Sequence, residues 1–202
     1  MKVQETPALL LGPEDHGRRM SLEEFARATG REGSLYELAK GVVIVVDVPG
    51  LSHSRIVREV ERQFTAYDLD HPEVIRHIAA GSDCAIRMPA MRSERHPDRA
   101  IYLTPPPADE NPWDLWTPEI VVEVVSRGQE ERDYGEKRQE YLVAGVREYW
   151  IVDPYRRTVL VLRRRGDDWT EEEVLAGGKV ATRLLPGFEL DTARLFALLD
   201  KP

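Results

Sequence analysis

The chain has 202 residues, of which 42% are hydrophobic and 32% charged, and its formal net charge is −8. This length is typical of one domain, and the composition excludes a disordered or membrane-embedded protein. A single cysteine, Cys84, excludes an intramolecular disulfide framework and a cysteine-based zinc site. The negative charge argues against a nucleic-acid coat protein but not against an enzyme acting on nucleic acid. No signal segment or apolar span is recognisable, so we expect a cytoplasmic protein.

The first 20 residues carry no periodic pattern, so we expect residues 1–20 to form an N-terminal arm and residues 21–202 a single domain. Ser21 and Glu24 have the spacing of a capping box, which predicts that a short helix begins there. Apolar residues at helical spacing predict further helices. In chain order these cover residues 51–69, capped by Ser52, then 132–144 and 192–199.

Short runs rich in β-branched and aromatic residues predict the strands. In chain order they cover residues 36–38, 42–48, 74–78, 83–88, 98–103, 119–125, 148–152, 158–163 and 169–175. The prolines and polar residues of 104–118 cannot sustain a helix or a strand ladder, and they predict a loop. This order of elements is that of a mixed α/β domain around a central sheet.

Glu123 is a charged residue within an apolar segment. It lies in IVVEVVS, an almost continuous apolar run that predicts a strand buried on both faces. An ionised carboxylate in such a strand costs several kcal/mol unless a cation or a metal offsets its charge. The alternative is a glutamate at a sheet edge or in a salt bridge to an arginine.

Asp98 and Lys137 would complete a phosphodiester-cleaving site with Glu123. Asp98 opens a predicted strand after Pro97, although acids at strand ends are often solvated turn residues. Lys137 lies at the edge of the apolar stripe of helix 132–144, so its ammonium could reach inward or extend to solvent. Two carboxylates on neighbouring strands can hold a divalent metal such as Mg²⁺. A nearby ammonium can position water and offset phosphate charge, which suits hydrolysis of a phosphodiester.

Three segments resemble the Uma-two family of restriction endonuclease-like proteins, a branch of the PD-(D/E)xK nuclease superfamily. They are HPDRAIYL, VVEVVS and DYGEKRQEYLVAGVREYWIVDP. LYELAKGVVIV, LSHSRIV and LPGFELDTARLF are similar to other parts of the family, so the resemblance covers nearly the whole domain. It implies a restriction endonuclease-like core, with a central mixed β-sheet flanked by helices. It also implies hydrolysis of a DNA substrate with Mg²⁺ or Mn²⁺.

The resemblance gives each matching residue an expected role. Asp98 and Glu123 would be catalytic acids that bind the metal, and Glu37, on the first strand, an accessory catalytic acid. The superfamily lysine normally stands two residues after the second acid, where this chain has Val125. The resemblance implies that Lys137, on the following helix, takes its place.

Two other functions remain open: a non-catalytic module that keeps the fold and binds a protein or nucleic acid, and a hydrolase of another phosphate ester. Buried catalytic groups favour the nuclease, because a pure binding module has no reason to bury them. His53 could approach the substrate or serve as a cap or surface group. Arginines around Asp98 could clamp phosphates or balance the acidic loop that follows. They are Arg87, Arg92, Arg95 and Arg99.

Trp113 and Trp116 are unusually apolar for the predicted loop at 104–118. They would either pack on the core or meet a second subunit. Isologous dimers are common, and nucleases that cut two strands often pair their active sites. We therefore expect a homodimer to which Trp113, Trp116 or the prolines near them contribute.

Overall fold

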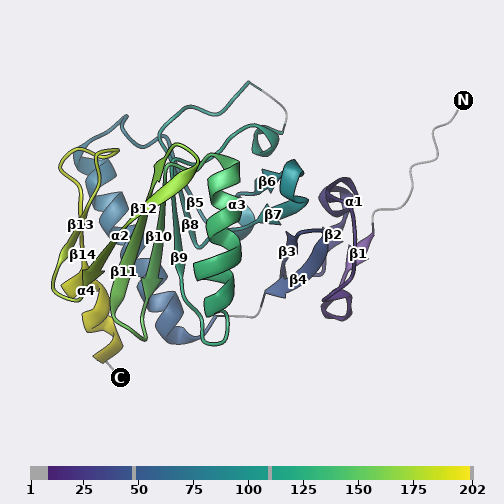
Figure 1. The fold of residues 1–202 in the computed structure, drawn as a ribbon, viewed down its shortest axis with the longest axis horizontal. Helices are drawn as coiled ribbons and strands as arrows, with labels where there is room; N and C mark the ends of the chain where they lie inside the picture. The colour runs from purple at the N-terminus through teal and green to yellow at the C-terminus, as the bar shows by residue number, and fades with distance from the viewer. Residues whose placement is uncertain (1–8, 47–48, 109–110, 201–202) are drawn as a thin grey trace, which may run out of the picture. The chain divides into compact units, whose positions relative to one another are not determined.

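A computed structural model describes residues 9–46, 49–108 and 111–200 of the chain (Figure 1). The chain divides into two compact units. The first takes its residues from Met1–Val48 and Arg87–Arg95, and the second from Pro49–Ile86 and His96–Pro202. Each unit is described by itself below. No helix in the described ranges is long and apolar enough to cross a membrane.

The first unit contains a four-stranded sheet in the order β4-β3-β7-β6 and a two-stranded sheet of β1 and β2. Its elements are β1 (Leu10–Leu11), η1 (Pro13–Asp15), α1 (Leu22–Arg27), β2 (Thr29–Gly30), β3 (Leu35–Ala39), β4 (Val42–Val46), β6 (Ile86–Met88), η3 (Pro89–Met91) and β7 (Ser93–Arg95). The predicted capping box is present at α1, where Ser21 and Glu24 exchange bonds of 3.1 and 2.8 Å. The strands predicted at 36–38 and 42–48 correspond to β3 and β4, which form an antiparallel hairpin; residues 47–48 lie outside the described part of the chain.

Part of the expected N-terminal arm is packed in the structure. β1 pairs in parallel with β2, and Leu11 and Met20 are buried beside Phe25 and Leu38. These two apolar residues stand too far apart in the sequence to form a periodic pattern, so they gave no signal. Whether residues 21–202 fold as one domain stays a prediction.

The second unit is built on a six-stranded mixed sheet in the order β12-β11-β10-β9-β8-β5. β9 and β10 are parallel, and the other neighbouring strands are antiparallel. Its elements are α2 (Leu51–Asp70), β5 (His77–Ala79), η2 (Gly81–Asp83), β8 (Arg99–Tyr102), η4 (Pro112–Asp114), β9 (Ile120–Val124), η5 (Arg132–Glu136), α3 (Lys137–Ala144), β10 (Glu148–Asp153), β11 (Thr158–Arg165), β12 (Asp168–Leu175), β13 (Lys179–Ala181), β14 (Glu189–Asp191), α4 (Thr192–Phe196) and η6 (Ala197–Asp200). The predicted mixed α/β class, with a central mixed sheet flanked by helices, is confirmed.

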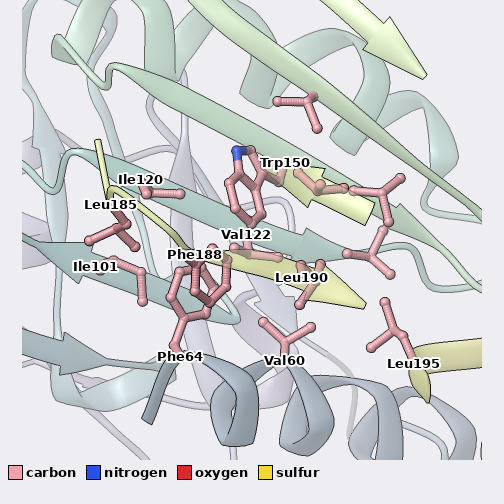
Figure 2. Packing of buried hydrophobic residues seen from close by; sticks show 14 of the residues in the cluster. Val60, Phe64, Ile101, Ile120, Val122, Trp150, Leu185, Phe188, Leu190 and Leu195 are labelled. Carbon is pink, nitrogen blue, oxygen red and sulfur yellow. The ribbon is translucent and has the colours of Figure 1, made fainter. Parts of the chain in front are cut away.

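Different helices cover the two faces of this sheet (Figure 1). On one face, Phe64 of α2 packs with Val122 and Trp150 in the main core, which β14 and α4 also join (Figure 2). α3 lies on the opposite face, where its Tyr141 contacts Glu123 of β9. Because side chains alternate across a strand, Val122 faces α2 while its neighbour Glu123 faces α3.

Two helix starts differ from the sequence prediction. The N-cap of α2 is Gly50, and Ser52 lies inside the first turn, so the predicted Ser52 cap is wrong. The predicted helix 132–144 begins with a π-helical stretch, η5, before α3 continues to Ala144. It ends as expected at Gly145, which takes a left-handed conformation with φ of 92°.

The two tryptophans of the predicted loop pack on their own chain. Trp116 is 8% exposed, its ring centroid lies 4.1 Å from that of Tyr102, and its indole N–H donates to the carbonyl of Thr104. Trp113 packs against the same cluster. Packing on the core is therefore the alternative observed, and a contribution of this segment to a dimer stays a prediction. The homodimer itself stays a prediction.

Candidate active site

Asp98 and Glu123 lie side by side at one end of two neighbouring inner strands, β8 and β9, of the six-stranded sheet. Glu123 belongs to β9, in which every residue is buried, and it is itself 3% exposed. Asp98 directly precedes β8, which runs antiparallel to β9 with Arg99 opposite Val122. Continuing this register by one residue sets Asp98 opposite Glu123, where Cβ atoms of facing residues are about 5 Å apart. This is the arrangement on adjacent strands that the sequence predicted.

Two donors hold the carboxylate of Asp98. Its Oδ2 accepts the backbone N–H of Val124 at 2.8 Å and lies 3.1 Å from Nε2 of His53, in the first turn of α2. Burial by itself lowers the pKa of His53. The hydrogen bond to Asp98 and the charges of Asp98 and Glu123 outweigh burial and raise that pKa above its ordinary value. The pKa of His53 therefore responds to both acids. His53, whose role the sequence left open between substrate contact and a cap or surface group, is a partner of Asp98.

The ammonium of Lys137 lies between two carboxylates. Its Nζ is 3.0 Å from Oε1 of Glu123 and 2.9 Å from Oδ1 of Asp133. Lys137 is 8% exposed, so the alternative of a lysine extending to solvent is wrong, and the predicted inward orientation toward Glu123 is confirmed. The hydroxyl of Tyr141 donates to the same oxygen of Glu123 at 2.5 Å.

Asp133 lies in the π-helical stretch that leads into Lys137. The backbone N–H of Lys137 donates to the carbonyl of Arg132, five residues earlier. The hydroxyl of Tyr149 donates to the carbonyl of Asp133 at 3.0 Å and fixes this wide turn on the sheet. π-Helical turns are rare in proteins, and those that occur are often found at functional sites. Asp133 has no assigned role in the sequence prediction, although its i, i+4 spacing to a lysine was a signal.

Glu37 belongs to the first unit and is 2% exposed. Its Oε2 accepts from Nη1 of Arg95 at 2.9 Å, and Arg95 is fully buried. Arg87 donates to Glu94 at 2.6 Å, while Arg99, in the second unit, binds an acid of α2. Each of these three arginines contacts an acid of its own unit. The accessory catalytic role of Glu37 stays a prediction.

The donor set of Asp98 and Glu123 fits an oxygen-liganded divalent ion. Among the described residues, no group of three or more His, Cys, Asp or Glu side chains is placed to hold a metal. Mg²⁺, however, is commonly bound by one or two carboxylates together with water and substrate phosphate oxygens. The side chain of Asp98 is 24% exposed, so water and a substrate can reach it. Zinc fits less well, because its sites use three or four nitrogen, sulfur or carboxylate ligands from the protein.

Comparisons with known proteins show the family and the fold of this chain. A model of the Uma2 family, described as "Putative restriction endonuclease", matches residues 22–193. No curated protein matches the sequence. Among solved structures, a nuclease from Anabaena variabilis ATCC 29413, titled as putative and as belonging to DUF820, has a TM-score of 0.70. The two sequences are 20% identical, and the match covers 89% of this chain and 99% of that one. At this identity the likeness shows the fold.

Proposed function

This chain belongs to the Uma2 family, which is described as "Putative restriction endonuclease". We propose that it is a metal-dependent endonuclease that hydrolyses DNA phosphodiester bonds. The family and the nuclease-fold relative support nuclease function. One observation carries the finer proposal. Glu123, inside a fully buried strand, stands opposite Asp98 and contacts the ammonium of Lys137. Burying these charges costs folding free energy, which a catalytic use would explain.

Each residue has a task in this proposal. Asp98 and Glu123 would hold Mg²⁺ or Mn²⁺, which when bound supplies charge stabilisation at the phosphoryl oxygens and a more acidic water. His53 and the N–H of Val124 keep the Asp98 carboxylate in one orientation. Lys137, held on the Glu123 side of the site, would orient the attacking water or stabilise the charge that develops on the phosphate.

Metal titration and cleavage assays test the proposal together. Calorimetry with Mg²⁺ and Mn²⁺ on the wild type and on Glu123→Ala should show binding that the variant loses. Cleavage of single- and double-stranded DNA should require the metal and stop when a chelator is added. If the wild type and Glu123→Ala show the same residual cleavage, that activity is contamination. A non-catalytic module that binds protein or nucleic acid then becomes the better explanation.

We also propose that the protein acts as a homodimer, because two active sites suit a substrate with two strands. Sedimentation at high concentration should show a dimer. With Trp116 packed on its own chain, Trp116→Ala should disturb folding more than association. A monomer at every concentration would contradict this part of the proposal without affecting the site.

A further inference from the structure

The loop that follows β9 holds an arginine with unusual surroundings. Arg127 is exposed, and its guanidinium carbon lies 5.3 Å from the centroid of the Tyr155 ring. Within the part of the chain that the structure describes, Arg127 forms no ion pair with a carboxylate. The charge of Arg127 affects the pKa of Glu130. The pKa of Glu130 is lowered mainly by backbone hydrogen bonds from Glu130 and Gly128, with Arg127 a smaller cause.

Tyr155 fixes Arg127 in place through two contacts. The hydroxyl of Tyr155 accepts the backbone N–H of Arg127 at 3.2 Å, and its ring packs against the guanidinium. Tyr155 is itself held by the buried Asp153, whose Oδ1 accepts the N–H groups of Tyr155 and Arg156, both at 2.9 Å. Because Tyr155 is 54% exposed, this supported arginine stands at the surface.

Arg127 and Tyr155 lie at the end of the sheet where β9 and β10 finish, which is also the end that carries the candidate active site. β9 and β10 are parallel, Ile151 stands opposite Glu123, and both strands therefore leave the sheet at this end. Arg127 follows Glu123 by four residues, which is at most about 14 Å along an extended chain. A long arginine side chain at this place can reach a phosphate next to the one at the carboxylates.

The π-helical stretch η5 contacts both the lysine of the candidate active site and the turn that carries Tyr155. Asp133 contacts Lys137, and the next residue, Tyr134, donates its hydroxyl to Oδ2 of Asp153 at 3.0 Å. Asp153 in turn holds the turn that presents Tyr155. The position of the arginine is thus fixed relative to the Lys137 contact by a short chain of hydrogen bonds.

We infer that Arg127 binds a backbone phosphate of the DNA strand next to the scissile one, and that Tyr155 positions it. The inference rests on the proposed function. A phosphodiester is repelled by the carboxylates of Asp98 and Glu123, in a chain with a net charge of −8, so a cation without an ion pair at the same end of the sheet has a clear use. A guanidinium can stack on a tyrosine ring with its planar face and still present its N–H edge to a phosphate.

The first test measures binding apart from cleavage. Anisotropy of a fluorescein-labelled DNA duplex, with Ca²⁺ in place of Mg²⁺, would be recorded for the wild type, Arg127→Gln and Arg165→Gln. Arg165 is an exposed arginine at the opposite end of the same sheet, since β11 runs antiparallel to β10. Arg127→Gln should raise Kd about tenfold and reduce the slope of log K against log salt by about 0.9, the loss of one phosphate contact. Arg165→Gln should stay within about twofold of the wild type.

The second test separates positioning from folding. Tyr155→Phe keeps the ring and should retain most of the affinity, whereas Tyr155→Leu should weaken binding about as much as Arg127→Gln. Combining Tyr155→Leu with Arg127→Gln should add little, because residues that act through one contact are not additive. In cleavage assays, Arg127→Gln should raise KM and leave kcat nearly unchanged, as expected for a binding residue.

The outcomes distinguish this inference from the proposed function. Equal weakening by Arg127→Gln and Arg165→Gln would overturn the inference, because it would show only a general effect of charge. If the wild type binds DNA through Arg127 but never cleaves it, the phosphate contact stands and the endonuclease proposal fails. If metal-dependent cleavage is intact and insensitive to Arg127→Gln, the reverse holds. A wild type that neither binds nor cleaves DNA overturns both.

Discussion

Two buried glutamates in the same sheet have different surroundings. Glu123 of β9 is 3% exposed and Glu148 of the neighbouring strand β10 is 4% exposed. Glu148 accepts from the indole N–H of Trp150 at 2.9 Å and from the hydroxyl of Thr182 at 2.8 Å. Glu123 instead contacts the ammonium of Lys137 and a tyrosine hydroxyl, and stands opposite a second acid.

The comparison shows that burial alone does not mark a functional acid. Glu148 accepts hydrogen bonds from two neutral donors, and Nε of the partly exposed Arg163 lies 3.6 Å from its Oε1. Hydrogen bonds to a charged group contribute to stability. The contacts of Glu123 gather ionisable groups at the end of the sheet, where Asp98 remains accessible to solvent. The burial of Glu148 is therefore explained by its structural hydrogen bonds, while the burial of Glu123 is explained by a catalytic role. The predictions below contrast the two.

The largest expected effect is the loss of cleavage in Glu123→Gln. Removing a metal-binding carboxylate should lower kcat/KM by about a thousandfold or more, because it removes several kcal/mol of transition-state stabilisation. The thermal midpoint should fall, since the buried ammonium of Lys137 loses one of its two carboxylate partners. The matched change Glu148→Gln should leave cleavage per folded molecule unchanged. Similar losses in the two variants would remove the functional distinction between the glutamates.

Lys137→Met should lower the cleavage rate by about a hundredfold to a thousandfold, the usual effect of removing one group that stabilises transition-state charge. Metal affinity measured by calorimetry should change little, because Asp98 and Glu123 remain. Lys179→Met is the control, since Lys179 is an exposed lysine paired with Glu189 in the same unit. Full activity in Lys137→Met would show that its ammonium only neutralises Glu123.

The two glutamates also show what sequence reasoning can reach. Glu123 is visible because an acid interrupts an apolar run, and the resemblance of the flanking segments assigns Asp98 and Lys137. The main helices and the six-stranded sheet follow from hydrophobic periodicity, because their apolar faces are long. Glu148 gave no comparable signal, since it starts its strand and its partner Thr182 is distant in the sequence.

The remaining site contacts depend on three-dimensional details. The contact of His53 with Asp98 requires the start of α2 to meet the start of β8. The contact of Asp133 with Lys137 has the i, i+4 spacing of a helical ion pair, but the sequence pattern did not show that it would be buried beside Glu123. The short strands β1, β2, β7, β13 and β14 have two or three residues each, too few for a periodic pattern. Tertiary pairing, not local preference, forms them.

Glu148→Ala should lower the free energy of unfolding by about 3 kcal/mol, because Trp150 and Thr182 would keep buried donors without an acceptor. Urea denaturation followed by tryptophan fluorescence would measure it. Glu189→Ala is the control, since this exposed glutamate forms a surface ion pair with Lys179 and should cost less than about 1 kcal/mol. Equal costs would mean that the buried network around Glu148 contributes no more than a surface pair.

The smallest expected effect uses Cys84 as a reporter of the charge on Glu123. Burial, followed by the charges of Asp83 and Glu123, raises the pKa of the Cys84 thiol to about 12. Because the folded-state pKa lies above the unfolded one, the thiol stabilises the fold below about pH 9, and this contribution is lost as pH rises toward 12.

Alkylation by iodoacetamide at pH 8 should therefore be about a thousandfold slower in the native protein than in urea, because only the thiolate reacts. Glu123→Gln removes one of the smaller causes of the raised pKa, so alkylation of the native protein should accelerate, but by less than about tenfold, which is one pKa unit. Glu148→Gln, whose glutamate is not among those causes, should leave the rate unchanged. If both variants accelerate alkylation equally, the cause is local opening rather than charge. A rate unchanged in Glu123→Gln would show that burial alone keeps the thiol protonated.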